Sequence, residues 1–123
     1  MKKTLKLGIA MFALAFMQSC YYDNEEELYP DTPVCDTLNV TYSGDVAIIM
    51  QDNCNACHGS SFPQSGIITD NYNDLKEIAD NGKLWGAVNH ENGYSPMPQD
   101  RPKLNDCDLS KIRIWINNGA LND

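Results

Sequence analysis

The strongest constraint on the fold of this protein is how many residues remain once its N-terminal segment is set aside. Near the N-terminus, Lys2, Lys3 and Lys6 lead into the uncharged apolar run 7–17 (LGIAMFALAFM). A cationic start, a short apolar run and a small residue before a cut are typical of a secretory signal peptide. The run is too short for a membrane-spanning helix, which needs about 20 residues. We therefore expect residues 1–19 to be a signal peptide, with a buried N-terminal helix as the alternative.

The residue that follows, Cys20, indicates that the signal peptide is of the lipoprotein type. The segment ending at Cys20 resembles the lipobox of bacterial lipoproteins, although Met17 and Gln18 depart from the usual box. The resemblance implies cleavage before Cys20 and acyl chains on its thiol, which would hold the protein at a membrane. Plain secretion is the alternative. We expect an exported lipoprotein that faces the periplasm or the cell surface.

The stretch after Cys20 is acidic. Residues 21–34 (YYDNEEELYPDTPV) combine five acidic side chains with two prolines, a composition typical of an extended, solvated segment. We interpret residues 20–34 as the lipid-anchor cysteine and an acidic tether. An acidic run at this place also resembles the surface-export signal of Bacteroidetes lipoproteins, and a plain spacer is equally compatible with it.

The charge of the chain excludes one class of partner. It carries 9 basic and 17 acidic side chains, a net charge of −8. Three of the basic residues leave with the signal peptide, so the mature balance is 6 to 17, a net of −11. Binding to nucleic acid needs a basic face. We expect no nucleic-acid partner.

Residues 35–123 have the composition of a small globular domain and contain no convincing strand. We predict an all-α fold of three to four short helices joined by long loops. Loops this long in so small a domain are expected where they wrap a bound group. A stripe of Leu109, Ile112, Trp115 and Ile116 predicts the buried face of the last helix. The expected helices are 45–53, a second one capped by Asn71 and stopped by Gly82, 84–89, and a last one capped by Asp108 and ended by Gly119.

The chemistry is carried by the sequence Cys54-Asn55-Ala56-Cys57-His58, which is the C-x-x-C-H pattern of covalent haem attachment. Thiols three positions apart lie on one side of a helical turn, where they can form thioethers to the two haem vinyl groups. The adjacent His58 then faces the iron as the proximal ligand. The motif predicts one covalent haem c on Cys54 and Cys57.

Three other interpretations of the motif compete. A thioredoxin-like pair would open a helix beside a β-α-β unit, whereas this motif follows a helix. Half of a zinc site would need further ligands, for which only Cys35, His90 and Cys107 are available. A structural disulfide would leave His58 unexplained.

A low-spin electron carrier needs a second axial ligand, and three side chains are candidates. Met50 lies on the helix that leads into the motif, cannot reach the other face of the ring, and is expected in the core. Met97 stands between two prolines in a loop, 39 residues after His58, and the prolines stiffen the backbone there. We predict Met97 as the distal ligand, with His90 as the alternative ligand or an exposed loop residue. Thioether ligation raises the reduction potential.

These residues together resemble a class I cytochrome c, and in particular the small cytochrome c-like lipoproteins of Bacteroidetes. The resemblance rests on C-N-A-C-H after a helix, a later M-P, and a terminal helix with an aromatic (IRIWINNGA), and it covers residues 35–123. It implies first and last helices that cross near right angles beside the haem. Ile49 and Met50 would then meet the apolar stripe of the last helix. The resemblance also suggests the Pro63 carbonyl as acceptor for the His58 ring, although Pro63 follows His58 unusually closely.

Two cysteines remain, Cys35 and Cys107. An exported protein meets an oxidising compartment, so we predict that they form a disulfide between the start of the domain and the start of the last helix. Two free thiols are the alternative.

The function expected from the sequence is a membrane-tethered one-electron carrier, not an enzyme, because no nucleophile or proton-transferring pair is evident. Its acidic surface predicts redox partners with basic docking patches. A haem peroxidase or gas-binding haem sensor with an open distal site is one alternative. A surface interaction lipoprotein without haem is another.

Overall fold

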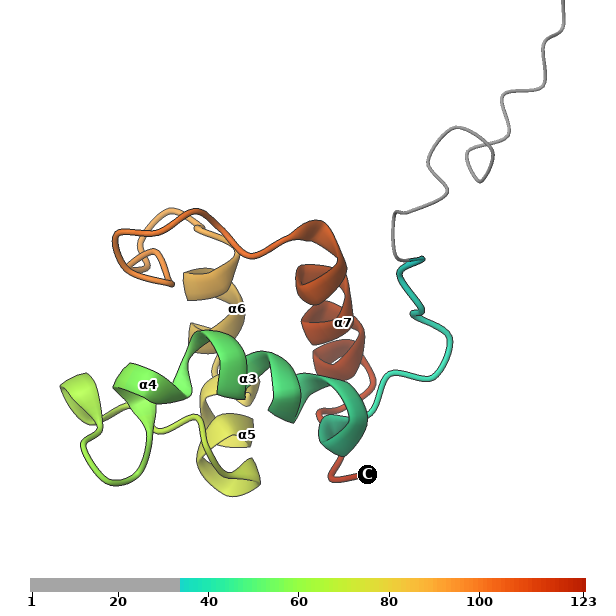
Figure 1. Ribbon diagram of the computed structural model, residues 1–123, viewed down its shortest axis with the longest axis horizontal. Helices are drawn as coiled ribbons and strands as arrows, with labels where there is room; N and C mark the ends of the chain where they lie inside the picture. The colour runs from blue at the N-terminus through green and yellow to red at the C-terminus, as the bar shows by residue number, and fades with distance from the viewer. Residues whose placement is uncertain (1–33) are drawn as a thin grey trace, which may run out of the picture. The chain divides into compact units, whose positions relative to one another are not determined.

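A computed structural model describes residues 34–123 of the chain (Figure 1). The predicted signal peptide, the lipidation site Cys20 and almost all of the predicted tether lie outside the described residues. Residues Cys35–Asp123 form one compact unit, and within the described part of the chain no helix has both the length and the apolar character needed to cross a membrane.

The described unit is all-α: it contains helices and no strand. The predicted all-α class is therefore confirmed. The expected number of three to four helices is too low for residues 34–123, because the chain breaks at Cys54 and Asn55–His58 form a separate short helix. The elements are a π-helical turn η1 (Tyr42–Val46), α3 (Ala47–Asn53), α4 (Asn55–His58), a 3₁₀ turn η2 (Gln64–Gly66), α5 (Tyr72–Asp80), α6 (Lys83–Val88) and α7 (Asp106–Asn117).

The starts of α5 and α7 follow the local side-chain chemistry. The Asn71 side chain accepts from the Asp74 N–H at 3.1 Å and begins α5, as predicted. The cap predicted at Asp108 is wrong. Asn105 caps α7 instead, and its side chain accepts from the Asp108 N–H at 2.9 Å. The Asn105 amide in turn donates to the Asp108 carboxylate at 2.8 Å, so Asp108 is the partner of the cap, one turn inside the helix.

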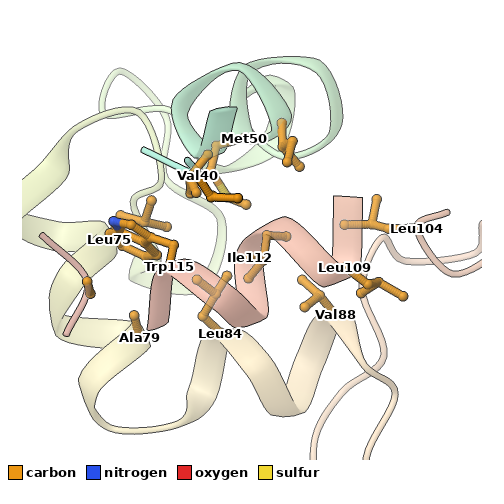
Figure 2. Packing of buried hydrophobic residues seen from close by; sticks show 13 residues of the cluster. Val40, Met50, Leu75, Ala79, Leu84, Val88, Leu104, Leu109, Ile112 and Trp115 are labelled. Carbon is orange, nitrogen blue, oxygen red and sulfur yellow. The ribbon is translucent and has the colours of Figure 1, made fainter. Parts of the chain in front are cut away.

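The core is a single cluster in which Met50, Ile112 and Trp115 are almost completely buried (Figure 2). Met50 is thus a core residue, as expected, and it shares this cluster with the stripe of α7. The Ile116 side chain packs against the cluster only partly buried. In Figure 1, α3 runs across the unit, α6 and α7 stand beside each other, and a long loop joins the last two at one end.

Two ties close the domain at its ends. Cys35 and Cys107 lie at disulfide distance, with 5.6 Å between their Cα atoms, as the sequence analysis expects. The C-terminal residue Asp123 accepts from the Tyr42 N–H at 2.8 Å through its side chain and from the Ser43 N–H at 3.0 Å through its main chain. Both ends of the described unit are therefore fixed to helical segments.

Candidate functional site

The C-x-x-C-H motif begins at the break after α3, where Cys54 lies, and its other four residues form the short helix α4. Cys54 leaves helical geometry (φ −124°, ψ −43°), and its N–H still donates to the Met50 carbonyl at 2.8 Å. Its carbonyl accepts from the N–H groups of Cys57 at 3.0 Å and His58 at 2.9 Å. The motif is thus one tight turn that is continuous with the core helix.

The turn is held from outside by the loop that follows it. The buried Thr69 donates from its N–H to the His58 carbonyl at 2.8 Å, and from its hydroxyl to the Asn55 side chain at 2.8 Å. One residue further on, the Asp70 carboxylate accepts from the Ser60 N–H at 2.7 Å and hydroxyl at 2.8 Å. Hydrogen bonds from Ser60 hold the pKa of Asp70 below its ordinary value. Thr69 and Asp70 have no recognisable signal in the sequence, because a loop residue has no periodicity to reveal its partner.

A cavity of about 340 Å³ opens beside the motif. Three of the predicted site residues line it: Cys54 and His58 from the motif, and Met97 from the loop between α6 and α7. Most of the remaining lining is apolar and comes from η2, α5, α6 and the adjoining loops. The other lining residues are Ser65, Ile67, Thr69, Ile78, Lys83, Leu84, Ala87, Val88, Tyr94 and Ser95.

The two motif cysteines differ in their surroundings. Cys57 is exposed, and Cys54 is partly buried. Burial, together with the neighbouring Cys57, raises the pKa of the Cys54 thiol to about 11. A reactive redox cysteine instead has a depressed pKa, and no strand flanks this pair among residues 34–123. The thioredoxin-like interpretation therefore gains no support.

The interpretation of the motif as half of a zinc site also gains no support. Cys35 and Cys107 are paired with each other. Within the described residues, no three His, Cys, Asp or Glu side chains are grouped so that they could hold a metal ion.

The His58 ring carries an unusual feature. Its Nδ1 atom is buried and has no hydrogen-bond partner among the described residues. The acceptor suggested by the family resemblance is not in place, because the Pro63 carbonyl accepts from the Gly66 N–H at 3.2 Å as part of the η2 turn. Pro63 follows His58 by only five positions, and its carbonyl is directed into the η2 turn. No acceptor among the described residues therefore orients the His58 ring through Nδ1.

The two other candidate ligands are not at the cavity. Met50 is fully buried in the core. His90 is exposed, does not line the cavity, and makes a 3.0 Å hydrogen bond between its Nε2 atom and the Met97 carbonyl. Of the three side chains considered for the second axial position, the structure brings only Met97 to the cavity with His58.

The chemistry of this cavity is defined by its donors. A thiol, an imidazole and a thioether meet in a mainly apolar space. These are nitrogen and sulfur donors of the kind that hold haem iron and attach the porphyrin, and the volume lies within the range of small-molecule sites. The Cys54 thiol, the His58 imidazole and the Met97 thioether therefore fit a haem at this cavity, whereas the exposed Cys57 does not line it.

Comparison with known protein families, curated proteins and solved structures finds no match to this chain.

Proposed function

We propose that this protein is a monohaem c-type cytochrome that carries single electrons while tethered to a membrane through a lipid on Cys20. The observation that carries the proposal is the joint presence of Cys54, His58 and Met97 on one cavity. His58 and Met97 are 39 residues apart in the chain, so no local periodicity requires them to meet.

Each residue has a distinct role in this proposal. The Cys54 and Cys57 thiols attach the porphyrin, His58 is the proximal ligand of the iron and Met97 is the distal one. A bound haem supplies a change of one electron between ferrous and ferric iron. The thioether of Met97 favours the reduced iron, and the apolar lining limits the access of water and so also influences the potential.

Covalent attachment suits a domain of this size. Residues 35–123 make a small core, and a domain this short buries a modest share of its surface. Two thioethers keep the prosthetic group in place without requiring the protein to enclose it completely.

The acidic charge bears on the partners. Residues 35–123 contain 12 acidic and 6 basic side chains. We propose that redox partners dock through basic patches and that added salt slows the encounter, because screening shortens the range of charge steering.

The test is a spectrum of the protein exported from cells with a cytochrome c maturation system. We expect a red product that keeps its haem after extraction with acidified organic solvent, and replacement of both Cys54 and Cys57 by alanine should abolish covalent retention. A colourless product would overturn the proposal and favour a surface interaction lipoprotein.

The distal ligand is tested with two methionine variants. Met97→Ala should convert the low-spin spectrum of the oxidised protein to that of iron with an open position, and should lower the reduction potential. Met50→Leu is the matched control, since Met50 is buried away from the cavity and Leu has a similar volume. If Met97→Ala left a low-spin spectrum unchanged, another side chain such as His90 would be the distal ligand. If wild type and variant both showed iron with an open position, a peroxidase or gas sensor would become the better interpretation.

The anchor is tested by Cys20→Ala. We expect the variant to leave the membrane fraction and appear in the soluble exported fraction with its haem content unchanged, because the anchor and the haem site are separate in the sequence.

A further inference from the structure

The loop that carries Met97 is fastened to α6 at several points. The Glu91 N–H donates to the Gly86 carbonyl at 2.8 Å, and the Met97 N–H donates to the Ala87 carbonyl at 3.0 Å. The segment between these bonds therefore begins and ends on the same helical turn, and its shape is fixed by main-chain contacts.

Packing holds the middle of this loop. The Tyr94 ring lies against Gly86, where an added Cβ atom would overlap the ring. Gly86 is buried in α6, and Tyr94 is 42% exposed. Because glycine has no side chain, Gly86 allows the loop to lie close to the helix.

His90 stands at the bend where the chain leaves α6. Its backbone is left-handed (φ 56°), a conformation that costs free energy for a residue with a side chain and persists where the surroundings require it. The bend directs the His90 ring back toward the end of the loop, and the Nε2 atom lies 3.0 Å from the Met97 carbonyl oxygen. Because a carbonyl only accepts, Nε2 carries the hydrogen and donates it.

Both main-chain polar groups of Met97 are therefore engaged, the N–H by Ala87 and the carbonyl by the His90 ring. We propose that His90 is a positioning residue that holds the Met97 main chain so that the thioether stays at the cavity. The inference rests on the proposed function, in which Met97 is the distal ligand. A ligand whose backbone is fixed in advance loses less entropy when it binds, so His90 makes displacement of Met97 from the iron less favourable.

Two measurements on His90 variants test this role. The first is hydrogen exchange of the Met97 amide in the exported protein, which reports how often the loop opens at the bond between this amide and the Ala87 carbonyl. The second is the affinity of the oxidised protein for added imidazole, which competes with Met97 for the iron. His90→Ala should speed the exchange and raise the imidazole affinity, each roughly threefold to tenfold, the range expected for one net hydrogen bond.

Rescue and control variants separate positioning from general damage. His90→Gln keeps a side-chain donor and should restore most of the wild-type affinity. His90→Gly removes the strain of the left-handed backbone but provides no side-chain donor. It should therefore give the same exchange rate and imidazole affinity as His90→Ala. Gln99→Ala, a change at an exposed neighbouring position, should change neither measurement. In a Met97→Ala background, His90→Ala should leave the imidazole affinity unchanged, because there is no thioether left to hold.

The outcomes also distinguish this inference from the proposed function. A protein without covalent haem would end the proposed function, yet the exchange of the Met97 amide would still test the contact with His90. Wild-type exchange and wild-type imidazole affinity in His90→Ala would overturn the positioning role. So would loss of the low-spin spectrum in both His90→Ala and His90→Gln, because His90 would then be the ligand itself.

Discussion

The Thr69 hydroxyl lies 2.8 Å from the Asn55 side-chain oxygen and donates to it. This bond joins the loop before α5 to a residue inside the C-x-x-C-H motif, and it accompanies the bond from the Thr69 N–H to the His58 carbonyl at 2.8 Å. The motif that would hold a haem is thus braced by a residue that follows it by more than ten positions.

Thr69→Val removes the hydroxyl that donates to Asn55 while keeping the shape of the side chain. The main-chain bond to the His58 carbonyl remains. We expect a loss of about 1–2 kcal/mol in the free energy of unfolding, because the partly buried Asn55 oxygen is left without its donor. Chemical denaturation followed by circular dichroism measures the loss. Thr69→Ser keeps the hydroxyl and should recover most of it, and equal losses in the two variants would show that the hydrogen bond contributes nothing.

The ion pair between Asp45 and Lys111 predicts a dependence of stability on pH. The two side chains lie 2.7 Å apart and join η1 to α7. Burial of the Asp45 carboxyl acts to raise its pKa, but the hydrogen bonds from Lys111 and the Thr41 N–H outweigh burial, so the pKa lies below its ordinary value. The contribution of Asp45 to stability is therefore complete above the unfolded pKa of about 3.9 and is lost as the pH falls through the folded value.

Asp45→Asn should consequently be less stable than wild type at neutral pH, and the difference should shrink below about pH 4. Thermal unfolding of both proteins between neutral and strongly acidic pH measures it. Asp52→Asn, an exposed change for which no ion pair is found in the described residues, is the matched control. A difference that stayed constant over this range would contradict the assignment.

The Cys35–Cys107 disulfide closes a long loop, with a sequence separation of 72. Replacing both cysteines with serine should lower the free energy of unfolding by about 4 kcal/mol, mainly because the unfolded chain regains conformational freedom. Urea denaturation of the variant and the wild type measures the change. Alkylation of Cys35 in the unreduced wild-type protein would show that the bridge does not form.

Gly86→Ala should act against the usual trend for helices. Alanine inside a helix normally stabilises it over glycine by about 0.5–1 kcal/mol, but at this position the new methyl group would overlap the Tyr94 ring. We expect a net loss of stability in thermal unfolding. The double variant with Tyr94→Ala should recover the ordinary gain from alanine, and a stabilised single variant would show that Tyr94 does not need this space.

Local patterns in the sequence predicted α3, α5, α6 and α7, but not the separate short helix α4. The Cys35–Cys107 pair was predicted because these two cysteines remained after the others had been assigned. Leu109, Ile112 and Trp115 of the α7 stripe are buried as their spacing predicts, whereas Ile116 is only partly buried. Asn71 caps α5 as its side-chain chemistry predicts. The cap of α7 was placed wrongly at Asp108 because Asn105 and Asp108 both suit a helix start. They exchange hydrogen bonds in the structure, and only the backbone geometry shows which of them is the cap.

The sequence by itself determined that this chain carries a C-x-x-C-H motif ahead of a proline-flanked methionine, and that its domain is helical, because motifs and helix periodicity are local properties. Three relationships depend on how the chain packs: Met97 lies on the cavity with His58, His90 is bonded to the Met97 carbonyl and does not line the cavity, and Thr69 is bonded to the motif. These relationships arise where loops fold back on helices. Loop residues have no periodicity, so their partners are set by how the whole chain packs.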